Sequence, residues 1–133
     1  SFAAEAKYKL RAGMTLECRE SSTVHDICEL SPVIKEFDYP PTTTFCTDDR
    51  EPDDLFREGH IDHVIRVAIS AGIPPIEAVK IATYNAANLL NCNDIGLLVP
   101  GRYANIVLLD DLYEFVSDEV FVKGVLIAKN GKI

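Results

Sequence analysis

Two short apolar segments of the sequence end in clusters of charged and hydroxyl side chains, and these clusters hold the residues that could do chemistry. The first cluster is Arg19-Glu20-Ser21-Ser22 and the second is Thr47-Asp48-Asp49-Arg50. Adjacent carboxylates repel each other and lose hydration when buried, and a metal ion or a nearby arginine offsets that cost. The pair Asp48-Asp49 therefore indicates either a site where a metal ion or an arginine relieves the repulsion or, equally well, a solvated turn or helix cap.

The three histidines give a weaker signal. His60 and His63 are three residues apart in a segment of helical periodicity, a spacing that can chelate a metal ion. Neighbouring apolar residues define the buried face of that helix, so we favour a surface or capping role for both. His25 is expected at the surface, in the first turn of another helix. The sequence contains no nucleophile elbow, phosphate-binding glycine loop or His-Glu-x-x-His motif.

Alternating helices and strands must position both clusters. Apolar periodicity predicts helices over 2–11, from Thr23 onward, over 61–69 and over 75–90, while strands are predicted over 14–18 and 42–47. We expect Thr23 and Asp26 to form a capping box, Pro32 to kink or end the helix that they open, and 51–59 to be a polar loop. Each cluster then follows the C-terminal end of a strand, where ligands bind in parallel α/β folds.

The last forty or so residues are expected to be mostly β-structure. Strands are predicted over 106–109 and over 120–128, the latter as one strand interrupted or bulged at Gly124. Asn130-Gly131 is a hairpin-turn dipeptide followed by only two residues, and the first helix lacks a start signal, so we expect a piece of a longer protein. A strand–helix–strand–helix run implies parallel strands, and two such units cannot close a barrel alone.

Composition excludes several classes of protein. The 133 residues are 47% hydrophobic and 26% charged, as in globular domains, and the net charge of −8 argues against a nucleic-acid partner. The sequence has neither a signal peptide nor an apolar span of ~20 residues, so we expect a cytoplasmic protein without a membrane partner. The sequence has no C-x-x-C pair, so we do not expect a structural zinc ribbon. We expect buried free thiols at Cys18, Cys28, Cys46 and Cys92.

Several motifs together resemble the adenine deaminases of the amidohydrolase superfamily, and the resemblance covers nearly the whole chain. The most specific block runs from Phe45 to Arg50 and continues in Gly59-His60-Ile61. Broader superfamily features are Pro100-Gly101-Arg102 and the strand 106–109. Supporting matches include Leu10-Arg11-Ala12-Gly13-Met14, Arg19-Glu20, Pro52, Asp53-Asp54-Leu55, Asp62, Ala82-Thr83, Asn85-Ala86-Ala87, Gly96 and Ala104.

The resemblance implies an α/β fold in which residues 1–92 are the last β/α units of a (β/α)8 metal-dependent hydrolase barrel and residues 93–133 are part of a small β-sandwich domain. It implies a dinuclear manganese or iron centre in the complete enzyme. A metal-activated water would attack C6 of adenine, giving hypoxanthine and ammonia. Asp48 would be both a metal ligand and the catalytic proton shuttle. Substrate-binding or supporting roles would fall to Arg19, Glu20, Ser22, Asp49 and Arg50.

Other ligands of such a centre are missing from this chain. We therefore expect the isolated chain to be inactive and to bind no metal by itself, while the complete enzyme would act on adenine as a homo-oligomer. Ser21 stands where many relatives have glycine, so the loop after the first strand could be shaped differently, and Asn105 replaces a common aspartate. Two alternatives remain open: another amidohydrolase, such as a deacetylase or cyclic-amide hydrolase, and a non-catalytic truncated α/β module.

Overall fold

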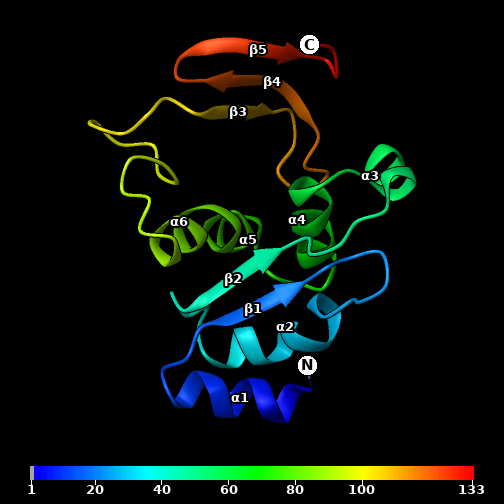
Figure 1. The fold of residues 1–133 in the computed structure, drawn as a ribbon, viewed down its shortest axis with the longest axis vertical. Helices are drawn as coiled ribbons and strands as arrows, with labels where there is room; N and C mark the ends of the chain where they lie inside the picture. The colour runs from blue at the N-terminus through cyan, green and yellow to red at the C-terminus, as the bar shows by residue number, and fades with distance from the viewer. Residues whose placement is uncertain (1) are drawn as a thin grey trace.

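The computed structural model describes residues 2–133 as a pair of parallel strands with their helices, followed by a three-stranded antiparallel sheet (Figure 1). From one end of the molecule to the other, Figure 1 shows α1, then α2 and the β1–β2 pair, then α5 and α6, and finally the antiparallel sheet. The elements are α1 (Ala3–Arg11), β1 (Leu16–Arg19), α2 (Ile27–Glu36), β2 (Thr43–Cys46), α3 (Pro52–Glu58), α4 (Ile61–Ser70), α5 (Pro75–Lys80), the π-helix η1 (Ile81–Asn85), α6 (Ala86–Leu89), β3 (Ile106–Leu109), β4 (Ser117–Val122) and β5 (Val125–Lys129).

The strands β1 and β2 are parallel neighbours, as their separation by a helix predicted. Their register pairs Leu16 with Thr43 and Arg19 with Cys46. Both strands lie close to the predicted ranges. Because the strands run in the same direction, their C-terminal ends meet at one edge, and the two polar clusters follow directly from there.

The hydrophobic core lies in the first part of the chain, between the helices and the parallel strands. The periodic apolar residues of α2 and α4 supply much of it, because residues three or four apart share one face of a helix. Its fully buried large side chains are Ile27, Leu30, Val33, Ile34, Val64, Ile73 and Ile81. No side chain between 93 and 133 is buried in this structure, so the antiparallel sheet contributes little to this core.

The helix α2 differs from its prediction at both its start and its middle. It begins at Ile27 with Asp26 at the N-cap, so the predicted capping box at Thr23 is wrong. Pro32 lies inside the helix and does not end it. Proline removes the N–H that would bond to the Cys28 carbonyl oxygen, but the Ser31 hydroxyl donates to that oxygen at 3.3 Å. The hydroxyl also lies 3.4 Å from the Ala71 carbonyl oxygen, and its single hydrogen is shared between the two, so the neighbouring serine offsets part of the missing bond.

The predicted loop over 51–59 is also wrong, because Pro52–Glu58 forms the helix α3. Proline at the first helical position fits there without losing a bond, and Asp53 and Asp54 in the first turn suit the positive end of the helix dipole. Gly59, with φ of 106°, ends the helix. A residue with a side chain would be strained in this conformation.

The predicted helix over 75–90 is present but contains a π-helical segment, η1, between α5 and α6. Its last residue, Asn85, is 1% exposed. The Asn85 amide Nδ2 donates to the Thr43 carbonyl oxygen at 2.9 Å and to that of Pro40 at 3.4 Å. This amide therefore joins the helical segment to the start of β2.

In the antiparallel sheet the order is β3-β4-β5. The single interrupted strand predicted over 120–128 is instead a hairpin, since β4 and β5 pair with each other across Lys123-Gly124. Both turn residues have positive φ, 51° and 79°, which explains the reversal. Asn130-Gly131 forms a second tight turn, and an isolated bridge pairs Lys129 with Lys132.

Membrane and cysteine predictions have separate outcomes. Between residues 2 and 133, no helix is long and apolar enough to cross a membrane. All four cysteines are free, as predicted, but only Cys18 is buried. Cys28 is exposed on α2, and Cys46 and Cys92 are partly exposed, because they do not share the inward-facing positions of the core.

Candidate functional site

The two polar clusters lie together at the C-terminal ends of β1 and β2. The Glu20 amide donates to the Cys46 carbonyl oxygen at 3.1 Å, which extends the pairing of the strands. Beyond it, the Ser22 amide donates to the Asp49 carbonyl oxygen at 3.1 Å, and the Glu51 amide donates to Ser22 Oγ at 2.8 Å. The loops that follow the two strands are therefore held to each other by backbone and hydroxyl contacts.

Asp48 is a partly exposed acid at this edge, and both of its carboxylate oxygens accept hydrogen bonds. Its backbone has φ of 53°, in the left-handed region that aspartate tolerates better than most residues. Oδ1 accepts the Asp49 amide at 2.9 Å, and Oδ2 accepts Arg19 Nη1 at 3.3 Å. The side chain remains 37% exposed, so a reacting molecule could reach the carboxylate.

Arg19 links Asp48 to a second acid, Asp26, which the sequence predicts only as part of a capping box. Arg19 Nε donates to Asp26 Oδ2 at 3.0 Å, and the Asp26 side chain is 5% exposed. Burial opposes ionisation of Asp26, yet contacts that include the Arg19 guanidinium hold its pKa below the usual value. The arginine therefore lies between two carboxylates.

Glu20 is buried beside this pair, with its side chain 6% exposed. Its Oε1 lies 2.5 Å from His25 Nδ1, and its Oε2 has no hydrogen-bond partner among residues 2–133. His25 is exposed, as predicted, but it precedes α2 instead of lying in its first turn. Ser21 accepts the Thr23 and Val24 amides on its hydroxyl and has no left-handed conformation.

Arg50 points away from Asp48. Its side chain is 3% exposed, and Nη2 donates to Glu58 Oε2 at 2.6 Å and to the Asp54 carbonyl oxygen at 3.3 Å. His63 Nε2 lies 3.6 Å from the same Glu58 oxygen. Burial, followed by the charge of Arg50, lowers the pKa of His63, which favours the neutral imidazole. Arg50 thus anchors α3 to the loop after β2.

His60 occupies the N-cap position of α4, but its side chain makes no hydrogen bond that caps the helix, so the predicted capping role stays a prediction. Its Nε2 lies 3.2 Å from Thr47 Oγ1, and its backbone amide donates to Asp62 Oδ1 at 2.7 Å. The pKa of Asp62 is lowered because hydrogen bonds from His60 and Arg66 outweigh the effect of its burial. These contacts fix the start of α4 against the residue preceding Asp48.

The residues that the structure describes hold no cluster of metal ligands. Across residues 2–133, no three histidine, cysteine, aspartate or glutamate side chains converge as a metal site. Asp48 and Asp26 both accept hydrogen bonds from Arg19, so each carboxylate is paired with its guanidinium. A metal ion held at Asp48 would therefore need ligands from outside residues 2–133.

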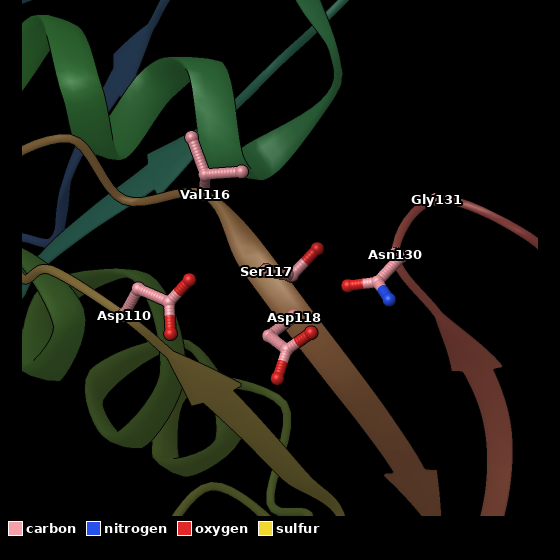
Figure 2. Close-up of a pocket in the computed structure, with 6 residues that line it drawn as sticks. All are labelled: Asp110, Val116, Ser117, Asp118, Asn130 and Gly131. Atoms are coloured by element: carbon pink, nitrogen blue, oxygen red, sulfur yellow. The ribbon is translucent and has the colours of Figure 1, made fainter.

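Two cavities of the structure lie away from this edge. A shallow one of about 360 Å³ lies at the antiparallel sheet, and Figure 2 shows the carboxylates of Asp110 and Asp118 and the amide of Asn130 around it. A larger groove of about 1190 Å³ runs between α4–α6 and β3–β4 and is lined mostly by apolar side chains such as Val79 and Leu97. Neither is lined by a predicted site residue.

Most predicted site residues lie together at one edge, whereas the side chain of Arg50 pairs with Glu58 on α3. Arg19 contacts Asp48 directly, while the backbone of Ser22 contacts that of Asp49. The partners Asp26 and Glu58 were missed. Only the charge of these two acids could have marked them, since a helix cap and a solvated acid have the same local pattern.

The chain is similar to a known protein family and to several curated proteins. Residues 3–133 match the profile of the amidohydrolase family. The adenine deaminase of Kosmotoga olearia is 47% identical over 129 residues, which are 97% of this chain and 22% of that protein. The adenine deaminase of Methylobacterium nodulans is 48% identical over 110 residues, 83% of this chain and 19% of that protein. The chain therefore spans about a fifth of the length of these curated relatives.

A solved structure shows the same arrangement of elements. The β-aspartyl dipeptidase of Fervidobacterium islandicum AW-1, in complex with a β-Asp-Leu dipeptide, superposes with a TM-score of 0.74. The likeness covers 96% of this chain and 36% of that one at 20% identity, so it shows the fold alone. With the match over residues 3–133, it shows an amidohydrolase-type α/β fold. The chain belongs to the amidohydrolase family.

Proposed function

We propose that the complete protein containing this chain deaminates adenine hydrolytically, giving hypoxanthine and ammonia. The observation that carries the proposal is the exposed carboxylate of Asp48 at the C-terminal end of β2, within a chain 47% identical to one adenine deaminase. Active sites of barrel enzymes lie at that end of the strands. Family membership alone would leave other hydrolytic substrates open, and the deaminase relatives favour adenine among them.

The role that we assign to Asp48 is proton transfer. Its carboxylate accepts a proton from the water whose oxygen bonds to C6 of adenine, and the same proton then passes to the departing amine. The C6–N bond breaks, ammonia leaves, and the oxygen stays on the ring, so one water is consumed for each ammonia released. A single carboxylate can act first as base and then as acid. Asp49, Glu20, Ser22 and Arg50 are proposed to support the site.

Further proposals concern the domains, the metal centre, the assembly and the location of the complete protein. We propose that residues 1–92 are the last units of a (β/α)8 barrel and that residues 93–133 are part of a β-sandwich domain. A dinuclear manganese or iron centre would take Asp48 as one ligand and its other ligands from the rest of the protein. A homo-oligomeric state and a cytoplasmic location stay predictions.

Adenine turnover by the complete protein, supplied with manganese, tests the proposal. Asp48→Asn is the decisive variant, since asparagine also tolerates the left-handed backbone and keeps the shape of the side chain while losing its basicity. We expect hypoxanthine formation by the wild type and its loss in the variant. A folded wild type that releases no ammonia from adenine but hydrolyses a cyclic amide or an N-acetyl group would replace the proposed substrate.

A further inference from the structure

The carboxylate of Asp48 depends on other residues for its orientation. It is partly exposed, at 37%, and an exposed side chain ordinarily samples several rotamers. The bond from Oδ1 to the Asp49 amide comes from the adjacent peptide and fixes one oxygen only. The other oxygen, Oδ2, is held by Arg19 Nη1 from the neighbouring strand. The second oxygen is thus engaged by a contact between the two strands, in which both side chains are a little over a third exposed.

Arg19 is itself held from behind. It is the last residue of β1, so its backbone belongs to the paired strands. Its Nε donates to the buried Asp26 at 3.0 Å, and because the guanidinium is planar, that contact sets the direction of Nη1. Asp26 occupies the N-cap position of α2, which connects the arginine to a helix packed in the core.

Arg50, the other arginine of the two clusters, pairs with a different acid. Its buried side chain is paired with Glu58 on α3. Within the part of the chain that the structure describes, Arg19 is the one cationic side chain paired with Asp48. The residue that orients Asp48 thus comes from the strand before it in the chain and not from the residues that follow it.

We propose that Arg19 is a positioning residue that holds Asp48 in its reactive orientation and is itself aimed by Asp26. The inference rests on the proposed function, because it requires Asp48 to act on the substrate. Arg19 touches the carboxylate and takes no proton, so its loss should impair the chemical step more than substrate binding. Residues that orient a reacting or ligating side chain from behind typically contribute about 10–100-fold to activity.

The test is steady-state kinetics of the complete protein on adenine, with Arg19→Ala, Arg19→Lys and Asp26→Asn compared with the wild type. We expect Arg19→Ala to lower kcat by about 10–100-fold with little change in KM. Added guanidinium ion, at concentrations that leave the wild type unaffected, should restore part of that kcat. Arg19→Lys should keep the charge but not the planar two-sided contact and lie between the two, and Asp26→Asn should lower kcat less than Arg19→Ala.

Arg57→Ala is the matched control, since Arg57 pairs with Asp53 on the surface with both side chains about 70% exposed, at 71% and 68%. Such a pair contributes little to stability, and we expect wild-type kinetics. An inactive wild type would refute the proposed function itself. An active wild type with Arg19→Ala equal to Arg57→Ala would refute only the positioning role. A loss of activity in Arg19→Ala that guanidinium does not restore and that accompanies a lower unfolding midpoint would also refute it, since it would show structural damage.

Discussion

The buried amide of Asn85 permits a quantitative test of how the helical segment after Pro75 is joined to β2. Asn85→Leu keeps a similar volume and removes the donor that bonds to the Thr43 and Pro40 carbonyl oxygens. The Pro40 oxygen still accepts the Thr43 amide at 2.9 Å, so the main loss is at the Thr43 oxygen. A buried carbonyl left without a donor costs about 1–3 kcal/mol, but the change also removes Asn85 Oδ1, a buried oxygen without a partner among residues 2–133, so we expect a loss of about 1 kcal/mol in the free energy of unfolding.

Urea unfolding of the complete protein, followed by circular dichroism, measures this change, and Asn85→Asp is the matched variant. The introduced carboxylate would face carbonyl oxygens in a buried site, which raises its pKa above the ~3.9 of an unfolded aspartate. Its protonated form can still donate to Thr43. The penalty should therefore be small below pH ~4 and grow as the pH rises through the raised pKa. Unfolding midpoints equal to that of the wild type in both variants at pH 7 would refute the reasoning.

Two further predictions concern the thiols and the histidine near Arg50. Burial raises the pKa of Cys18 to about 12, so a much smaller fraction of this thiol than of an exposed one is present as the reactive thiolate at neutral pH. Iodoacetamide should therefore modify exposed Cys28 long before Cys18, and equal labelling of the two native thiols in peptide mass spectra would contradict this. Burial lowers the pKa of His63, so the folded state resists protonation and the free energy of unfolding should fall as the pH drops below ~6.5, the value of an unfolded histidine. His63→Gln should flatten that dependence in urea unfolding across a pH series, and an unchanged slope would speak against it.

The sequence was sufficient to predict which segments meet. Period-two and β-branched patterns located β1 and β2, and the intervening helix implied that the strands are parallel, so their polar ends had to lie together. The same patterns could not show that Arg19 bridges Asp48 and Asp26. That bridge depends on rotamers and on a partner 29 residues away in the chain, neither of which leaves a periodic signal.

Local rules failed where a neighbour compensates for an unfavourable residue or where two patterns look alike. The segment containing Asp53 and Asp54 has turn chemistry, but proline followed by two acids is equally the start of a short helix. The sequence predicts a bulge or interruption at Gly124 within one strand, but the positive φ that glycine permits also allows a hairpin. The π-helical segment ending at Asn85 left no signal, because its apolar residues keep a helical spacing.

The compensation within α2 has a consequence for how this helix can change during evolution. Pro32 is tolerated where the Ser31 hydroxyl bonds to the Cys28 carbonyl oxygen. The two residues are in contact with the same group, so the effects of replacing them are not additive. With Pro32 in place, replacing Ser31 leaves the Cys28 carbonyl oxygen without this donor, so Ser31 is more constrained than it would be in a helix that keeps the N–H at position 32.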